Sequence, residues 1–125
     1  ILDAVGLIIW TWEPAAAVLR PALAHGYPDT VLAQLPAVAR EAENATAAAF
    51  RSAGLCAVTG SDRMNGALVA PLITSVGCVG VLAVELRHGS EQTACVRALV
   101  TMFAAQLAAL IATAERAEAL DRKRA

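Results

Sequence analysis

The sequence has almost no net charge and few aromatic residues. Ten Lys and Arg residues are balanced by eleven Asp and Glu residues, so the formal net charge is −1 and the pI is near 6.1. Without a basic surplus the chain lacks the electrostatic field that attracts phosphate backbones, so we expect no direct contact with nucleic acid. Aromatic residues make up only 4% of the chain, so its core must rest on Leu, Val and Ile.

Cysteine is also scarce, and its spacing excludes two kinds of site. The three cysteines, Cys56, Cys78 and Cys95, lie far apart in the sequence and form no CxxC pair. An odd number at wide spacing is typical neither of a disulfide framework nor of a zinc site, and it fits reduced thiols in a cytoplasmic protein. The only histidines, His25 and His88, are expected at the surface.

Motifs for catalysis and for cofactors are missing as well. No pair of His, Asp or Glu residues at helical spacing suggests a metal site, and no Gly-rich phosphate loop is visible. We therefore predict that the chain is not an enzyme and has neither catalytic residues nor a metal site, and no cofactor is evident. The sequence also has no initiator Met and no signal peptide, so we expect a fragment of a longer protein.

Hydrophobic residues, by contrast, are abundant. They make up 58% of 125 residues, enough apolar surface for one folded domain over residues 1–125. Residues 98–114 carry no charge and approach the roughly 20 apolar residues of a membrane-spanning helix. Thr101, Gln106 and Thr113 interrupt this run, and its bulky residues gather on one side, so we expect a helix packed on protein and no membrane contact.

The hydrophobic pattern predicts five strands. Residues 4–12 are rich in β-branched and aromatic residues and have apolar groups on both faces, which indicates a central strand. Residues 17–25 form a second strand, where Pro21 predicts an edge position or a bulge. A short strand at 55–58 precedes a polar loop, and two apolar runs then form a hairpin around a Gly-containing loop at residues 74–77; these runs span 67–73 and 78–86.

Three helices are expected between and after these strands. A short one runs to residue 35 with Asp29 or Thr30 as its cap, and a second covers about 43–52 with Asn44 as a cap and Gly54 as a stop. Ser90 and Glu91 are predicted to open the last helix. Its apolar stripe, expected to face the sheet, consists of Val96, Leu99, Val100, Phe103, Leu107, Leu110, Ile111 and Ala114. A second face, suited to close approach of another helix, consists of Met102, Ala105, Ala109 and Ala112.

Three segments resemble a known family in their order and spacing. They are LVAPL at 68–72, GVLAVE at 80–85 and FAAQLA at 103–108. In GAF domains a "PL" hairpin and a "GVLA-E" strand precede a helix with an "A-Q-LA" sequence, so the chain resembles the GAF family. Residues 25–28 and 47–52 are looser matches, and the resemblance covers essentially the whole chain.

The resemblance implies an α+β fold like that of PAS domains. It has a central antiparallel sheet of five to six strands, a long C-terminal helix on one face, and short helices over a possible ligand pocket on the other. The long helix that usually precedes the first strand in this family is absent from residues 1–125, and residues 115–125 resemble the start of a connecting signalling helix. The pocket is expected between the first strand, the fifth strand at residues 78–86, and residues 27–65.

The resemblance also implies a sensory role in a larger bacterial signalling protein, such as a transcription regulator or a two-component system. We expect an unidentified small-molecule ligand, a homodimer formed through the C-terminal helix, or both, with an output domain in the parent protein. The residues expected to border the pocket are Tyr27, Phe50, Arg51, Cys56, Asp62, Arg63 and Met64. Each also has an ordinary structural interpretation, as a core residue, a loop cover or a surface charge.

The three cysteines leave an alternative open. Free methionine sulfoxide reductases share the GAF fold and use thiols around the pocket, so a thiol enzyme of that kind is the second hypothesis. The positions of Cys78 and Cys95, at a strand start and on a helix face, speak against it.

Overall fold

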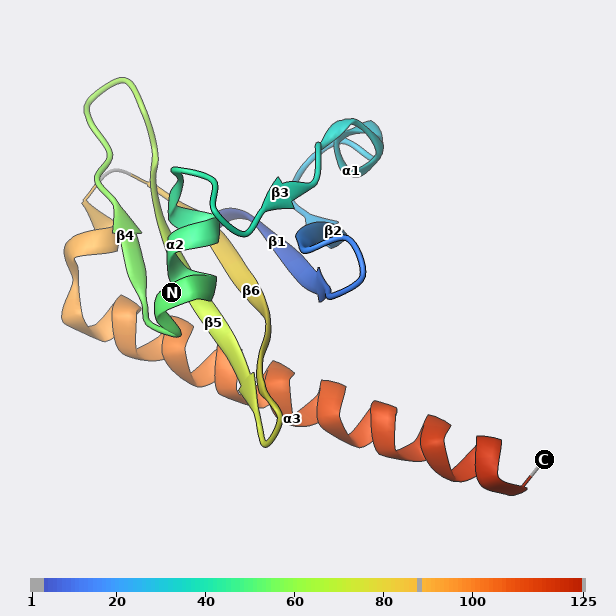
Figure 1. Cartoon of the computed structure of the whole chain (residues 1–125). Helices are drawn as coiled ribbons and strands as arrows, with labels where there is room; N and C mark the ends of the chain where they lie inside the picture. Colours follow the sequence, from blue (N-terminus) through green and yellow to red (C-terminus); the bar gives the residue numbers. More distant parts are fainter. Residues whose placement is uncertain (1–3, 88, 125) are drawn as a thin grey trace.

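The computed structural model describes residues 4–87 and 89–124, so His88 lies outside the described residues. Within these described residues, one antiparallel sheet holds six strands in the order β3-β2-β1-β6-β5-β4 (Figure 1). The strands are β1 Ala4–Glu13, β2 Val18–His25, β3 Val38–Ala39, β4 Cys56–Val58, β5 Gly66–Thr74 and β6 Gly77–Leu86. The helices are α1 Thr30–Gln34, α2 Ala45–Ser52, the 3₁₀ turn η1 Ser90–Gln92 and α3 Ala94–Arg124. The α+β class and the antiparallel sheet are confirmed; the two-residue strand β3 was not predicted.

The N-terminal strands show both features that the sequence predicts for them. β1 lies inside the sheet, paired with β2 on one side and β6 on the other. In β2 the register shifts, because Ile9 faces Leu23 while the next residue, Trp10, faces Pro21. Ala22 is therefore the extra residue of a bulge beside the proline, which has no N–H to donate to the ladder.

The β5–β6 hairpin has a shorter turn than the sequence suggested. Thr74 pairs directly with Gly77, which leaves a two-residue turn, and Gly77 has a φ of 117°, a conformation that L side chains rarely adopt. Pro71 lies in β5 beyond Val69, the last residue that pairs with β4. At Pro71 the outer edge of β5 no longer pairs with β4, so a residue without an N–H is tolerated there.

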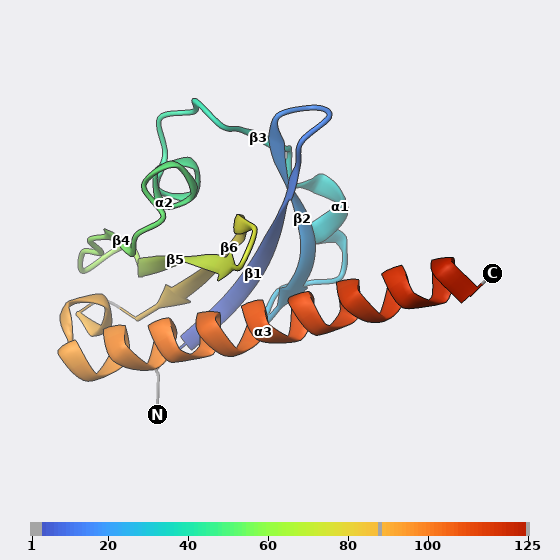
Figure 2. The same ribbon diagram turned by 60° about the horizontal axis from the view of Figure 1, so that its bottom comes forward.

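Alternation along β5 and β6 divides the core between the two faces of the sheet. Leu68, Ala70 and Leu72 are buried against α3, whereas Val69 between them is buried on the side of α2. Figure 2 shows α3 running beneath the sheet and α2 lying above it. The long C-terminal helix on one face and the short helix on the other confirm the expected layers.

The helix ends differ from expectation in two places. Asn44 caps α2 as predicted, with its side-chain oxygen accepting a hydrogen bond from Ala47 N at 2.9 Å. The left-handed residue that ends α2 is Ala53, with a φ of 51°, and not Gly54. Asp29 precedes α1 but makes no side-chain cap hydrogen bond, so the predicted capping there is wrong.

The last helix starts later than predicted, and the face that it turns toward the sheet differs from the predicted stripe. Ser90 and Glu91 form the separate turn η1, and α3 begins at Ala94. The residues of α3 buried against the sheet are Val96, Val100, Ala104 and Ala108. Phe103 and Leu110, which were predicted to face the sheet, are 43% and 66% exposed. Alanines at the contact let the helix approach the sheet closely, and this turns the bulkier residues to the side.

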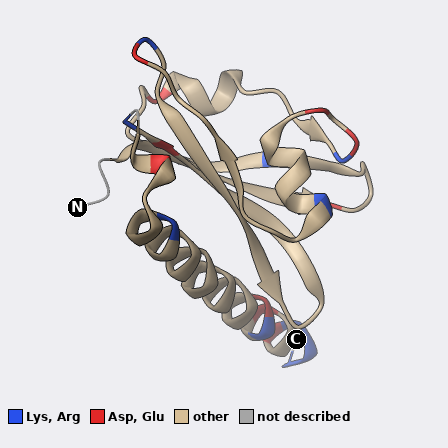
Figure 3. Cartoon of the chain, turned by 90° about the vertical axis from the view of Figure 1, so that its left-hand side faces the viewer, with Lys and Arg blue, Asp and Glu red and all other residues tan. Residues whose placement is uncertain are grey.

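By length and composition alone, α3 could cross a membrane. In the structure it packs along the sheet in its first half and extends beyond it in its second (Figure 1). Basic and acidic residues gather near its C-terminal end (Figure 3). One face of this helix covers the core, through Val96, Val100, Ala104 and Ala108, while 22% of its most apolar 18-residue stretch is buried.

Candidate functional site

A cavity of about 530 Å³ opens on the α2 side of the sheet. Its lining comes from β1, β5 and β6, from Tyr27 after β2, and from the loop that precedes β5. The lining residues are Ile8, Tyr27, Arg63, Met64, Asn65, Gly66, Ala67, Ala83, Val84 and Glu85. Most of the strand residues in this set are small or aliphatic, and the polar groups come mainly from the two loops. Such a mixture of apolar walls and few polar groups is typical of small-molecule sites.

Glu85 of β6 holds the polar end of the cavity together. The Tyr27 hydroxyl donates a hydrogen bond to its Oε1 at 2.7 Å, and the Asn65 amide donates one to its Oε2 at 2.7 Å. These two donors come from loops 38 residues apart in the sequence, so the carboxylate joins both walls of the cavity. Both contacts are hydrogen bonds to an ionised group, which are shorter and stronger than those between neutral groups.

Tyr27 is positioned by a glycine as well as by its hydrogen bond. Its ring lies against Gly6 of β1, where an added Cβ atom would come within 2.6 Å of the ring. Burial and the neighbouring Glu85 carboxylate together raise the pKa of Tyr27 above its ordinary value. The phenol therefore remains a hydrogen-bond donor at every physiological pH.

Glu91 in η1 anchors the loop between β4 and β5. Its side chain is fully buried; Oε2 accepts a hydrogen bond from Gly60 N and Oε1 one from Gly89 N, each at 3.0 Å. Gly66 lies so close that an added Cβ atom would be 2.3 Å from the carboxyl group. The loop that carries Arg63, Met64 and Asn65 is thus fixed to the start of the last helix.

Three of the residues expected at the site line this cavity: Tyr27, Arg63 and Met64. Asp62 is exposed in the turn between Ser61 and Met64 and does not line it. The whole set therefore does not converge on one cavity.

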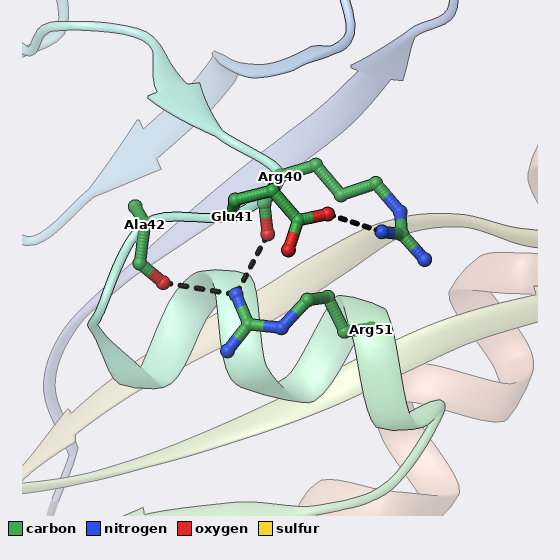
Figure 4. Close-up of polar contacts among 4 residues, drawn as sticks. All are labelled: Arg40, Glu41, Ala42 and Arg51. Carbon is green, nitrogen blue, oxygen red and sulfur yellow. Dashed lines mark hydrogen bonds and ion pairs between the residues drawn. The ribbon is translucent and has the colours of Figure 1, made fainter.

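The other three expected residues have structural contacts elsewhere. Phe50 is buried and its ring lies against Trp12, with ring centroids 4.5 Å apart. Cys56 packs at the edge of the hydrophobic cluster on the α2 side of the sheet, to which Phe50 belongs. Arg51 donates from Nη1 to the carbonyl oxygens of Arg40 at 2.7 Å and Ala42 at 2.9 Å (Figure 4), so its guanidinium fixes the approach to α2.

Sequence reasoning missed Asn65 and Glu85 as site residues. Glu85 was part of the motif that carried the family resemblance, and a Glu ending an apolar strand was the available signal. Asn65 lay in the polar loop with nothing to distinguish it from its neighbours.

The thiols lie away from this cavity. Cys56 is in β4, Cys78 in β6 and Cys95 in α3, and none of these three described residues lines it. Cys78 borders a different hollow at the hairpin end of the sheet, and burial raises the pKa of its thiol. Within residues 4–87 and 89–124, no group of three or more His, Cys, Asp or Glu residues is placed to hold a metal ion.

No family model and no curated protein matches the sequence. Solved structures do match. The second GAF domain of DevS from Mycobacterium smegmatis is 28% identical with a TM-score of 0.73, over 92% of this chain and 86% of that one. The GAF domain of the Acinetobacter phosphoenolpyruvate-protein phosphotransferase has a TM-score of 0.77 at 13% identity, over 94% of this chain and 76% of that one.

A third match is an enzyme. Free methionine-R-sulfoxide reductase from Neisseria meningitidis, solved with its substrate, has a TM-score of 0.64 at 16% identity, over 84% of this chain and 65% of that one. At this identity the likeness shows the fold alone. The shared architecture and the GAF matches together define the class of protein: the chain is a GAF domain.

Proposed function

We propose that the chain is a sensory input domain of a larger bacterial signalling protein and that it binds a small molecule in the Tyr27–Glu85 cavity. The observation that carries this proposal is the cavity itself, with apolar walls and polar groups converging on one carboxylate. The matched domains of DevS and of the phosphotransferase are each one part of a named larger protein, which fits a regulatory module. We propose a cytoplasmic location, with no contact to nucleic acid or membrane.

A route from the cavity to the output runs through η1. The loop that lines the cavity is held by the Glu91 carboxylate, which accepts a hydrogen bond from Gly60 N. The Arg97 Nε donates to the Glu91 carbonyl oxygen at 2.8 Å, which ties η1 to the first turn of α3. A ligand that shifts this loop would therefore displace the start of α3, whose far end at residues 115–124 would continue toward an output domain of a transcription regulator or a two-component system.

Melting temperatures across a metabolite panel test ligand binding. Ala83→Leu places a larger side chain in the cavity wall, and Ala98→Leu on the exposed side of α3 is the matched control. A ligand at 100 times its Kd stabilises the folded state by about 2.7 kcal/mol, which raises the melting temperature of a domain of this size by roughly 10 °C. We expect at least one metabolite to stabilise the wild type and Ala98→Leu but not Ala83→Leu. Equal stabilisation of all three proteins would place binding elsewhere.

We also propose that α3 mediates a homodimer. Four large apolar side chains on it are substantially exposed: Met102, Phe103, Leu110 and Leu120. Phe103 and Leu110 also border a groove of about 260 Å³ beside Ala4 and Leu7, lined almost entirely by apolar atoms. Exposed apolar residues in such a row are typical of a helix that has a partner.

Sedimentation equilibrium tests the dimer. Phe103→Glu places a charge in the row, and Thr101→Glu adds the same charge at an exposed position on a different face of the helix. We expect the wild type and Thr101→Glu to sediment as dimers and Phe103→Glu as a monomer. A monomeric wild type in a protein that retains its flanking sequence contradicts the proposal.

The sulfoxide reductase match favours a second candidate function, a thiol enzyme acting on free methionine sulfoxide. The three thiols lie outside the cavity, so we prefer the sensory function. If the wild type reduces methionine sulfoxide and the triple variant Cys56→Ser, Cys78→Ser, Cys95→Ser does not, the enzyme is the correct function.

A further inference from the structure

The charge balance of the Tyr27–Glu85 cavity indicates which ligands it accepts. Glu85 is half-buried, and both of its carboxylate oxygens are held by neutral donors, a phenol and an amide. Within the described part of the chain, no ion pair joins Glu85 to a cation. The negative charge therefore stays in a cavity whose walls are largely apolar, where a charge without a counterion is unfavourable.

The carboxylate keeps hydrogen-bonding capacity for a ligand. Each carboxylate oxygen accepts up to two hydrogen bonds, and the two bonds to Tyr27 and Asn65 use one position on each oxygen. The same two bonds fix the orientation of the carboxylate before any ligand arrives. A preorganised acceptor avoids the side-chain ordering that weakens binding at mobile groups.

The cations in the expected site do not compensate this charge. Arg51 donates to two backbone carbonyl groups near α2 and does not line the cavity. Arg63 does line it, but it is exposed, so water and salt screen its charge. An anionic ligand, which two arginines would favour, would instead meet the fixed carboxylate of Glu85.

We infer that the cavity binds a small organic cation, with its ammonium group at the Glu85 carboxylate and its apolar body over Ile8, Ala67 and Ala83. This inference rests on the proposed function, in which this cavity is the ligand site. Ile8, Ala67 and Ala83 come from three different strands and are only partly buried, so they leave apolar surface for a ligand to cover. The ligand class is thus a primary amine with an aliphatic or aromatic body.

Chemical-shift mapping of backbone amides tests this inference with three probes of one shape. Benzylammonium carries the cation, benzyl alcohol is its neutral counterpart and benzoate its anionic one. We expect benzylammonium to shift the amides of Tyr27, Asn65 and Ala83 at the lowest concentration. In Glu85→Gln its Kd should rise about tenfold to a hundredfold, because a hydrogen bond to a charged group is lost.

Glu118→Gln is the matched control, since it removes the same charge from an exposed position on the last helix. Its Kd for benzylammonium should equal that of the wild type. If benzoate or benzyl alcohol shifts the same amides as strongly as benzylammonium, the cavity is a ligand site but the cation assignment is wrong. If no probe shifts these amides, the cation assignment and the proposed ligand site both fail.

Discussion

Replacing Glu91 should destabilise the domain more than replacing any other Asp or Glu in the described part of the chain. Its side chain is fully buried and accepts hydrogen bonds from Gly60 N and Gly89 N. In Glu91→Gln one oxygen becomes an NH₂ group, which would face one of these N–H donors. A buried donor left without an acceptor costs about 1–3 kcal/mol, so we expect the free energy of unfolding to fall by that amount.

Glu91→Ala should be worse. It removes both acceptors and leaves a cavity beside Gly66, and the two effects together cost roughly 3–5 kcal/mol. A typical domain is stable by only about 5–15 kcal/mol, so this variant approaches the limit of folding.

Urea unfolding followed by tryptophan fluorescence measures both variants, because Trp10 is buried in the core and Trp12 packs on Phe50. Glu118→Gln, whose side chain is 74% exposed, is the control and should unfold like the wild type. If Glu91→Gln lies within about 0.5 kcal/mol of the wild type, its buried hydrogen bonds do not hold the loop and the reasoning fails.

Three further predictions follow from single residues. Tyr27 is the only tyrosine in the sequence, so phenolate absorbance reports its ionisation alone. We expect Tyr27 to titrate above the ordinary tyrosine pKa of about 10 in the wild type. In Glu85→Gln its pKa should lie closer to that ordinary value. Because the folded-state pKa is raised, its contribution to stability is complete below pH about 10 and is lost as the pH rises further; an unshifted titration in the folded wild type would contradict the hydrogen bond. Arg51→Met should lower the free energy of unfolding by about 0.5–1.5 kcal/mol in the same urea assay, because two exposed backbone carbonyl groups exchange this donor for water; no change would show that these bonds are dispensable. Ala53→Gly should raise the melting temperature, because the left-handed conformation costs a residue with a Cβ atom about 1 kcal/mol; a lower melting temperature would refute this.

Local signals in the sequence were sufficient for most of the fold. Asn44 before an apolar run predicted a cap, Pro21 predicted an edge position or a bulge, and the hairpin followed from two apolar runs around a turn. Glu91 was misassigned because its partner Gly60 is 31 residues away, a distance at which sequence patterns carry no signal. Ala53 was missed because Gly is the residue that usually takes the left-handed conformation at a helix end, whereas α2 ends on Ala53 in that conformation.

The site was harder to predict than the fold. Tyr27 and Arg63 were expected at a pocket because of the family resemblance, and both line the cavity. Arg51 was expected there for its charge, but the backbone carbonyl groups near it satisfy its guanidinium. Glu85 acquires its importance only when folding brings two distant loops to its carboxylate, and no local pattern reports that convergence.

The central claim is that this GAF domain binds a small molecule between Tyr27 and Glu85. A crystal structure with the metabolite that most raises the melting temperature tests it directly. The account predicts the ligand in the cavity, in contact with the Glu85 carboxylate and with Ile8 or Ala83. A ligand bound only in the groove beside Phe103, or at any other place on the surface, would contradict it.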